Sequence, residues 1–170
     1  MTRRADITIR PLTAADAEQY RTFRLRGLRE HSDAFRSSFE DESRKDIATT
    51  RERLTAGQFL GAFDKNRPLI GAIGLLLEVG LKPRHIGQVI GMYVIREHAG
   101  QGVGASLLQA LIDQARSTAG LEQLLLTVTL SNAHAKRLYE SMGFEVFGVE
   151  PRAIKVGEQY FDKAHMILFL

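Results

Sequence analysis

The sequence predicts an α/β (α+β) fold in which a mixed, mostly antiparallel central sheet is flanked by helices. Most of the predicted strands follow one another across short turns, which favours antiparallel pairing. Only the helix that follows a glycine-rich turn is placed to cross over between two parallel strands. The resulting order is β-α-α-β-β-β-α-β-α-β-β, and we expect it to form a single domain over residues 1–170.

The first half of the chain supplies a short strand, two helices and three further strands. Ile7–Arg10 alternates apolar and polar residues as a strand does, and Pro11 stops it. Thr13, with Asp16 three residues later, is typical of a helix start, and this helix runs to about Glu30. The segment over 31–43 is polar and irregular, and it is followed by a helix over 44–56 that ends at Gly57. Three strands are then expected, over 59–63, 69–79 and 86–95.

The second half of the chain alternates helices and strands. An amphipathic helix over 103–118 follows the glycine-rich turn, and its apolar positions share one face. The strand over 121–130 is almost continuously apolar, which is typical of a central strand covered on both sides. Ser131 or Asn132 can cap the next helix, which Gly143 ends. The last two strands are expected over 144–149 and 159–169, with Gly157 in the turn between them.

Composition narrows the class of protein. With 170 residues, 44% of them hydrophobic, the chain can bury a sizeable core. The absence of cysteine excludes disulfides, thiolate metal ligands and a cysteine nucleophile. The N-terminal segment lacks the apolar core of a secretory signal and no apolar run is long enough to span a membrane, so we expect a cytoplasmic protein. The net charge of +3 does not indicate nucleic-acid binding, and the arginines of the first helix are interpreted as its solvated face: Arg21, Arg24, Arg26 and Arg29.

Three glycines fall within the six residues Ala99–Gly104, between a predicted strand and the helix that follows it. Glycine tolerates positive φ and lets the backbone approach a ligand closely. Because the first N–H groups of a helix lack internal partners, this turn is suited to bind a phosphate or pyrophosphate. Ala105-Ser106 stands where a P-loop needs Lys and Ser/Thr, and the next strand ends in Thr129-Leu130-Ser131, without the acidic residue of a dinucleotide-binding fold. Taken alone, the turn is equally compatible with a plain strand–helix linker.

Two stretches of the sequence carry a resemblance to a known family. Met92-Tyr93-Val94, followed by Ala99–Gly104 and Leu107-Leu108, resembles motif A of the GNAT superfamily of N-acetyltransferases. The pattern Ser131-Asn132-x-x-Ala135-x-x-Leu138-Tyr139-x-x-x-Gly143-Phe144 is similar to its motif B, and the predicted element order matches the GNAT domain. Ala99 departs from the Gln or Arg that usually opens motif A, which removes one polar side chain near the expected pyrophosphate.

The resemblance implies acetyl-CoA as a co-substrate, bound where the strands over 86–95 and 121–130 splay apart, and no metal. Met92 and Val94 would contact the acetyl and pantetheine groups through their backbone, and an N–H there would stabilise the oxyanion. The backbone amides expected to hold the pyrophosphate are those of Gly100, Gln101, Gly102, Val103, Gly104 and Ala105.

Two further positions of the second motif have a binding and a structural interpretation. Asn132 would bond the pantetheine or a water molecule, although it is equally suited to cap its helix. Lys136, with its neighbour Arg137, would reach the phosphates of CoA as a point charge, unless both simply form a solvated helix face.

Tyr139 is the residue to which the resemblance gives a catalytic role. Direct attack of an amine on a thioester releases a thiolate, and a phenol with a pKa of about 10 can protonate it as a general acid. A buried tyrosine with a satisfied hydroxyl is the alternative interpretation. The sequence selects no general base among the four titratable residues near the central strands, Glu78, His85, Glu97 and His98.

The sequence therefore predicts an acetyl-CoA-dependent N-acetyltransferase that acts on a primary amine in a ternary complex. A non-catalytic CoA- or acyl-CoA-binding or sensing module with the same fold is the alternative. The expected partner is a small-molecule amine or a protein amine, with no nucleic acid and no membrane, and a homodimer stays open. Acceptor choice in the superfamily depends on segments that correspond here to about 20–45 and 148–162, where the acidic run Glu40-Asp41-Glu42 can attract a cationic amine or simply be solvated.

Overall fold

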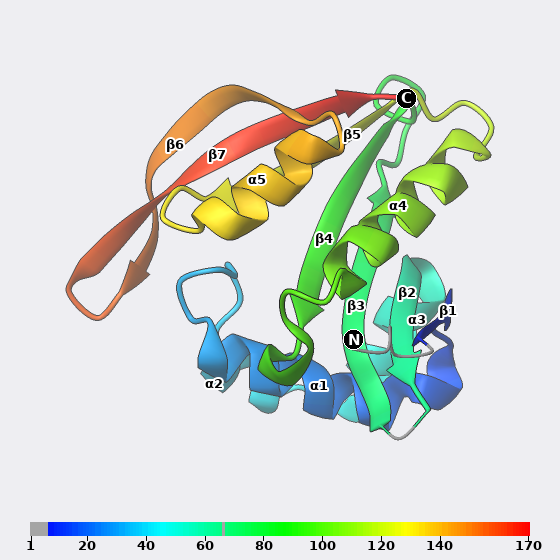
Figure 1. Ribbon diagram of the computed structural model, residues 1–170, viewed down its shortest axis with the longest axis vertical. Coiled ribbons are helices and arrows are strands. Elements are labelled where there is room, and N and C mark those ends of the chain that lie inside the picture. Colours follow the sequence, from blue (N-terminus) through cyan, green and yellow to red (C-terminus); the bar gives the residue numbers. More distant parts are fainter. Residues whose placement is uncertain (1–6, 66) are drawn as a thin grey trace.

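The computed structural model describes residues 7–65 and 67–170, and its strands form one seven-stranded sheet in the order β1-β2-β3-β4-β5-β7-β6 (Figure 1). The strands are β1 (Ile7–Pro11), β2 (Gln58–Asp64), β3 (Arg67–Leu77), β4 (Ile86–Val94), β5 (Gln123–Thr129), β6 (Glu145–Val156) and β7 (Gln159–Phe169). All neighbouring strands pair antiparallel except β4 and β5, which pair parallel. The predicted mixed, mostly antiparallel sheet with one parallel crossover is confirmed.

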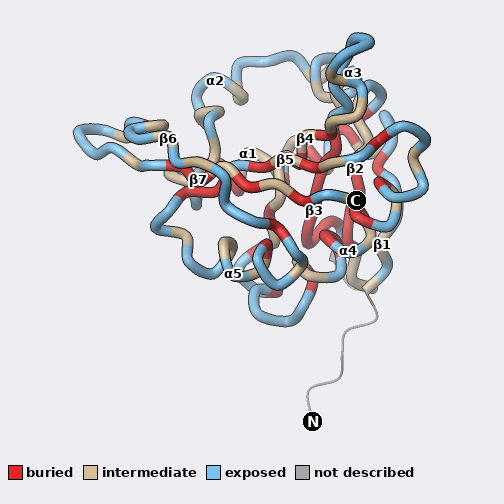
Figure 2. Tube along the Cα trace, turned by 90° about the horizontal axis from the view of Figure 1, so that it is seen from above, coloured by how far each residue is buried: buried red, intermediate tan, exposed pale blue. Residues whose placement is uncertain are grey.

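Helices cover both faces of this sheet. They are α1 (Ala17–Glu30), α2 (Phe39–Ser43), α3 (Ile47–Ala56), α4 (Val103–Arg116) and α5 (Ala133–Ser141), with 3-10 turns at Ala14–Asp16 and Arg96–His98. In the view of Figure 2, α4 and α5 lie on one side of the sheet and α2 and α3 on the other. Helix α1 packs with α3, and both contact the ring of Phe59. The ring centre of Tyr20 on α1 lies 5.7 Å from the ring centre of Phe59, and Cζ of Arg53 on α3 lies 5.5 Å from it.

Two expectations about the elements are corrected by the structure. The segment over 31–43, expected to be irregular, contains α2, whose N-cap Ser38 accepts a hydrogen bond from the N–H of Asp41 at 3.0 Å. Strand β6 continues to Val156 instead of ending at Val149, because it pairs with β7 on both sides of a bulge. In both places a tertiary or capping interaction decides the structure of a polar segment.

Strands β4 and β5 separate toward their carboxyl ends. Their parallel pairing joins Ile86–Gln88 to Gln123–Leu125, whereas β4 continues to Val94 and β5 to Thr129. Beyond Gln88, β4 is paired with β3 but not with β5, and we call this segment the unpaired part of β4. It contains a register shift in the β3–β4 pairing, where Gly91 adopts a φ of +60°. Figure 1 shows the two strands diverging, with α5 beside β5 and the start of α4 beside β4. The parallel crossover thus ends at an opening in the sheet.

Helix α4 lies close to the sheet because β3 has a glycine beneath it. A Cβ at Gly71 would lie 2.9 Å from Cδ1 of Leu107 and 3.2 Å from Cγ1 of Val103. Both side chains of α4 are buried in the core. The position of the N-terminus of α4 at the opening in the sheet therefore depends on a small residue in β3.

We expect Gly71→Ala to lower the free energy of unfolding by about 1–3 kcal/mol, because a tightly packed core must shift to admit the methyl group. Gly148→Ala is the matched control, since Gly148 also lies in a strand and a Cβ there would have no neighbour within 4 Å. Urea unfolding of both variants measures the difference. Equal stability of the two would show that α4 can move away from β3 without cost.

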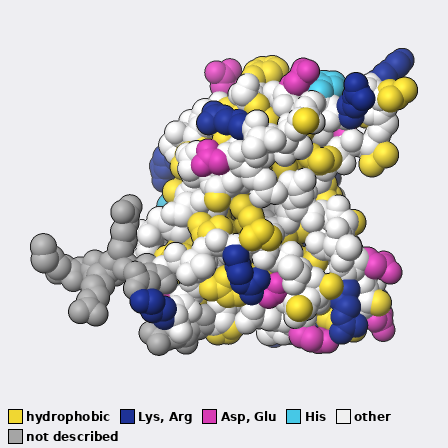
Figure 3. All heavy atoms as spheres, turned by 90° about the vertical axis from the view of Figure 1, so that its right-hand side faces the viewer, with side chains coloured by type: hydrophobic (Ala, Val, Ile, Leu, Met, Phe, Trp, Pro, Cys, Tyr) yellow, Lys and Arg dark blue, Asp and Glu magenta, His cyan; other side chains and the backbone are white. Residues whose placement is uncertain are grey.

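The surface carries charges of both signs. On the face that Figure 3 shows, basic and acidic side chains of the described residues are interspersed, in keeping with the net charge of +3. No helix in the described part of the chain is both long and apolar enough to cross a membrane.

Candidate active site

A cleft of about 640 Å³ lies where β4 and β5 diverge. Its walls come from the carboxyl end of β4, the glycine-rich turn, the start of α4 and the inner face of α5. The structure therefore brings together most of the residues that the sequence assigns to the site. Those that line the cleft are Met92, Val94, Gly100, Gly102, Val103, Gly104, Ala105, Asn132 and Tyr139.

The glycine-rich turn presents its backbone to this cleft. Gly100 and Gly102 adopt φ values of +73° and +82°, and a Cβ at either would meet no atom within 4 Å. Gly102 is the N-cap of α4, and its carbonyl accepts a helical hydrogen bond from the N–H of Ser106 at 3.0 Å. The N–H groups of residues 103–105 precede this bond, so they have no partner within the helix. This end of the cleft suits a phosphate or pyrophosphate.

Gly104 differs from the other two glycines of the turn. It lies inside α4 and does not adopt a positive φ. A Cβ at Gly104 would lie 3.0 Å from Cε of Met92 and 3.4 Å from Cδ2 of Leu138. Its missing side chain thus keeps α4 close to β4 and α5, and it does not give the turn conformational freedom.

Tyr139 lies on α5 with its hydroxyl directed at β4. The hydroxyl donates to Sδ of Met92 at 3.4 Å, and the ring packs edge-on against Phe144 with the ring centres 6.0 Å apart. Burial of the side chain raises the pKa of the phenol to about 12. Tyr139 therefore stays protonated at neutral pH, and a weak sulfur acceptor holds its proton. Such a hydroxyl can protonate a thiolate that forms in the cleft.

Asn132 is the N-cap of α5. Its Oδ1 accepts a hydrogen bond from the N–H of Ala135 at 3.1 Å, so the capping interpretation is confirmed. The cap engages only the carbonyl oxygen of the side chain, and Asn132 also lines the cleft. A contact between its amide NH₂ group and a ligand stays a prediction.

Two residues assigned to acetyl-CoA lie outside the lining of the cleft. The side chain of Gln101 donates to the carbonyl of Glu97 at 3.1 Å, and the ammonium of Lys136 pairs with Glu140 one turn along α5. Arg137 lines the cleft in place of Lys136, because one residue along a helix turns the side-chain direction by about 100°. No motif of the sequence marks two other residues of the lining, His31 and His134.

Of the four candidate bases, His98 lines the cleft. Its Nε2 lies 3.7 Å from Oδ2 of Asp64, and its buried Nδ1 has no hydrogen-bond partner among the described residues. Glu97 forms an ion pair on the surface at 2.8 Å. Glu78 and His85 lie at the opposite end of β4, beside its first residues. The geometry selects none of them as a base for an amine at the Tyr139 end of the cleft.

A second cavity, of about 260 Å³, adjoins the cleft and contains basic side chains that the sequence does not point to. One of them is Arg24, and its assignment to a solvated helix face is wrong. The Arg24 side chain is 11% exposed and its Nε pairs with Oε2 of Glu42 at 2.6 Å. Helix α2, which brings Glu42 to this face of α1, was not predicted. Lys163 is buried on β7 in the same cavity, and this burial lowers its pKa to about 8.

Comparison with known sequences points to one family. The model of the acetyltransferase (GNAT) family matches residues 25–144. Two curated L-methionine sulfoximine/L-methionine sulfone acetyltransferases, from Pseudomonas paraeruginosa and Pseudomonas aeruginosa, are each 34% identical to this chain over 79 residues. The matched segment covers 46% of this chain and 45% of the length of those proteins.

Comparison with solved structures supports the fold. The acetyltransferase of the GNAT family from Streptococcus pneumoniae superposes with a TM-score of 0.88 at 24% identity, over 97% of this chain and 100% of that one. The structure of yncA from Salmonella typhimurium with its cofactor acetyl-CoA gives a TM-score of 0.78 at 24% identity, over 98% and 95% of the two chains. At these identities the likeness establishes the fold, and it confirms the predicted arrangement of sheet and helices.

Proposed function

This chain belongs to the acetyltransferase (GNAT) family, and on that premise we propose that it transfers the acetyl group of acetyl-CoA to a primary amine. The observation that carries the proposal is one cleft with two chemically different ends. An open glycine turn at a helix N-terminus lies at one end, and the buried hydroxyl of Tyr139 lies at the other. The first end suits a phosphate and the second suits a leaving group that needs a proton. We expect the enzyme to act in the cytoplasm.

The residues of the cleft fit acetyl-CoA in charge and in shape. The backbone around Gly100 and Gly102, which no side chain covers, would hold the pyrophosphate through the free N–H groups at the start of α4. Arg137 would add a positive charge for the phosphates. The backbone of Met92 and Val94 would contact the acetyl and pantetheine groups on the part of β4 that β5 leaves unpaired.

The proposed reaction is a direct transfer in a ternary complex. The neutral amine attacks the thioester carbonyl, so that a C–N bond forms and the C–S bond breaks. The proton that the amine loses passes to water and, through water, replaces the proton that Tyr139 gives to the thiolate. A backbone N–H of β4 near Met92 stabilises the oxyanion of the tetrahedral intermediate. Tyr139 then protonates the departing thiolate, since its pKa of about 12 keeps the proton on the phenol until that moment. The chain has no cysteine, so no cysteine acyl-enzyme competes with this route.

The acceptor is a small-molecule amine or a protein amine. The curated Pseudomonas relatives are named for small amino-acid derivatives, which supports the first class for this chain. A module that only binds or senses acyl-CoA would need the glycine turn but would not need a proton donor at the other end of the cleft.

We expect acetyl-CoA to stabilise the folded protein, because a ligand that binds only the folded state raises the free energy of unfolding. At about 100 times its Kd the gain is about 2.7 kcal/mol, which corresponds to a rise in Tm of roughly 5–10 °C for a chain of this size. Thermal melts with acetyl-CoA measure the effect, and pantetheine without the phosphates serves as the control. No shift at millimolar acetyl-CoA, together with no heat in calorimetry, would contradict the proposed site.

Turnover separates an enzyme from a binding module. Because the protein has no thiol of its own, a thiol reagent reports released CoA without background. The protein is incubated with acetyl-CoA and a panel of amines, and acetylated products are identified by mass spectrometry. Binding of acetyl-CoA without release of CoA for any amine would favour the binding or sensing module.

A further inference from the structure

The second cavity opens beside the reacting end of the acetyl-CoA cleft. The two cavities share six lining residues: Ala34, Phe35, Met92, Asn132, Ala135 and Tyr139. The glycine-rich turn lines only the first cavity, so a molecule in the second would meet the Tyr139 hydroxyl without crossing the phosphate site. The volume of about 260 Å³ lies just below the range of about 300–1,000 Å³ typical of drug-sized ligands. The second cavity is therefore placed and sized for a small acceptor.

The second cavity has a surplus of positive charge. Its lining contains four basic side chains and, among the described residues, no Asp or Glu: Arg24, Arg36, Arg53 and Lys163. Arg24 pairs with Glu42 at 2.6 Å, and Arg36 pairs with Glu150 on β6, which also contacts His165. The ammonium of Lys163 donates to a backbone carbonyl at 2.7 Å. Asp33 also acts on Lys163, so four positive charges face three negative ones and leave a net positive field, which is screened less in a partly buried cavity than on the surface.

Two of the guanidinium groups lie against the unpaired part of β4. A Cβ at Gly91 would be 3.8 Å from Nη1 of Arg24 and 3.9 Å from Nη2 of Arg53. The Nε of Arg53 is buried and has no hydrogen-bond partner among the described residues. Nη1 of Arg53 lies 3.9 Å from Oε2 of Glu42, which is too long for a hydrogen bond. Arg53 thus has donors that the described residues leave unused beside the strand that carries Met92.

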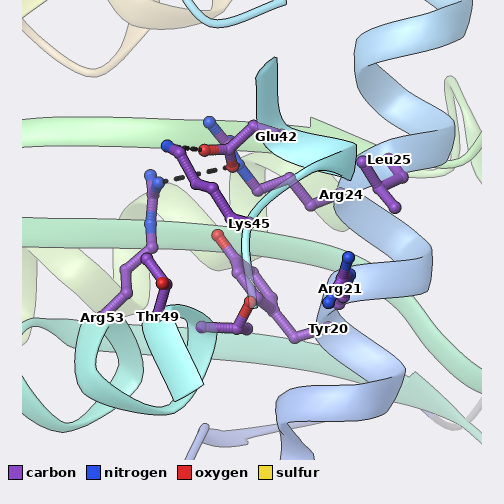
Figure 4. Close-up of a pocket in the computed structure, with 9 residues that line it drawn as sticks. Tyr20, Arg21, Arg24, Leu25, Glu42, Lys45, Thr49 and Arg53 are labelled. Carbon is purple, nitrogen blue, oxygen red and sulfur yellow. Dashed lines mark hydrogen bonds and ion pairs between the residues drawn. The ribbon is translucent and has the colours of Figure 1, made fainter. Parts of the chain in front are cut away.

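Glu42 does not neutralise the positive charge of Arg24 and Arg53. Figure 4 shows its carboxylate between the ends of Arg24, Lys45 and Arg53, so that one negative charge faces three positive ones. Burial acts to raise the pKa of Glu42, but hydrogen bonds from Lys45 and Arg24 outweigh it and hold this pKa down at about 2, so Glu42 is ionised at all working pH values. The acidic run that contains Glu42 is therefore engaged with basic side chains, and this part of it does not attract a cationic amine.

We propose that Arg24 and Arg53 bind an anionic oxygen group on the acceptor, in the simplest case the carboxylate of an amino acid. The inference rests on the proposed acetyl transfer and specifies its acceptor. A guanidinium binds a carboxylate through N–H bonds from its planar fork, and Nη1 of Arg24 and Nη2 of Arg53 both lie beside Gly91, where they can donate to one carboxylate. Gly91 directly precedes Met92, so a carboxylate held at Gly91 leaves the α-amine within reach of the thioester.

The same positive charges select against acceptors without a carboxylate. An acceptor that carries only positive charge would be repelled by these groups, whereas the carboxylate of an amino acid is attracted to them.

The test compares acceptors that differ only in the carboxylate. The standard L-amino acids are screened with acetyl-CoA for release of CoA, and the best acceptor is compared with its carboxamide and with its decarboxylated amine. We expect kcat/KM for the amino acid to exceed that for either analogue by about 10- to 100-fold, the usual effect of a charge-assisted hydrogen-bonded pair. The KM for acetyl-CoA should not depend on the acceptor.

Variants of Arg53 localise the effect. Arg53→Gln should lower kcat/KM for the amino acid by about 10- to 100-fold and lower that for the carboxamide by a much smaller factor. Arg53→Lys should fall between the two, because it keeps the charge and loses the paired donors. Arg51→Gln is the matched control, since Arg51 lies on α3 with a half-exposed side chain and lines neither cavity.

Each outcome has a separate meaning. Equal kcat/KM for the amino acid and its carboxamide would overturn the carboxylate site, and so would an equal loss for both acceptors in Arg53→Gln. Either result would leave acetyl transfer itself intact. A failure to acetylate any amine, with or without a carboxylate, would instead contradict the proposed function on which the inference rests.

Discussion

Replacing Tyr139 with Phe is expected to lower kcat by about 10²–10⁴-fold, the usual effect of removing a general acid. The substitution deletes the hydroxyl that contacts Sδ of Met92 at 3.4 Å and keeps the ring that packs on Phe144. Because the lost contact is a weak hydrogen bond to sulfur, stability and affinity for acetyl-CoA should change little. The expected signature is therefore a loss of kcat with the affinity for acetyl-CoA retained.

The measurement is kcat for both forms across pH, with the best acceptor from the amine screen. In the unaltered enzyme the pKa of Tyr139 is about 12, so ionisation of this phenol should not lower kcat below about pH 11. Tyr160→Phe is the matched control, since its ring is exposed on β7 beneath the guanidinium of Arg152 and lines neither cavity. An undiminished kcat in Tyr139→Phe would show that Tyr139 is structural and that the thiolate leaves unaided or takes its proton from water.

The glycine-rich turn of the candidate site could be predicted because all of its signals are local. A strand, a turn with Gly100 and Gly102, and a helix with one apolar face follow one another within a short stretch of the chain. Helical spacing also places Tyr139 on the apolar face of α5, but its position at the site was expected only from the resemblance of the second motif. The turn requires no knowledge of how distant segments pack, whereas the contact of Tyr139 with Met92 depends on it.

The second cavity, where we propose that the acceptor binds, could not be predicted in the same way. Arg24 and Arg53 come together only because α1 packs against α3 and both reach the unpaired part of β4. In the sequence Arg24 is one of several arginines on a helix, and nothing local separates it from those that face solvent. Helix α2 supplies the ion pair that holds Arg24 in place, and its polar sequence is also typical of a loop.

Two other differences between the expected and the observed structure concern the rotation of a helix and the length of a strand. Lys136 and Arg137 are neighbours, and the exact rotation of α5 decides that Arg137 lines the cleft. The far end of β6 depends on its partner β7, because the residues beyond Val149 are largely exposed and have no alternating apolar pattern. At the bulge within β6, Arg152 adopts a φ of +52° and its N–H donates to Oδ1 of Asp162 at 2.7 Å, a conformation that no local signal indicates.

Replacing Gly102 with Val is expected to weaken acetyl-CoA binding by about 10- to 100-fold, the effect of losing a hydrogen bond to a charged group. Gly102 has a φ of +82° and is the N-cap of α4, so a branched side chain both strains the turn and projects into space that the phosphate needs. Gly104→Val would be a less specific probe, because its side chain would also push against Met92 and Leu138. Calorimetry with acetyl-CoA measures the loss of affinity for Gly102→Val.

Gly120→Val is the matched control, and it separates backbone strain from loss of the binding site. Gly120 has a φ of +78°, a Cβ there would also meet no atom within 4 Å, and it lies beyond the other end of α4. Both substitutions should therefore lower the free energy of unfolding by a similar amount, about 1–2 kcal/mol. Only Gly102→Val should also lose affinity, because only its backbone faces the cleft. If folded Gly102→Val bound acetyl-CoA as tightly as Gly120→Val, the turn would be a linker between β4 and α4, and the phosphates would have to bind elsewhere.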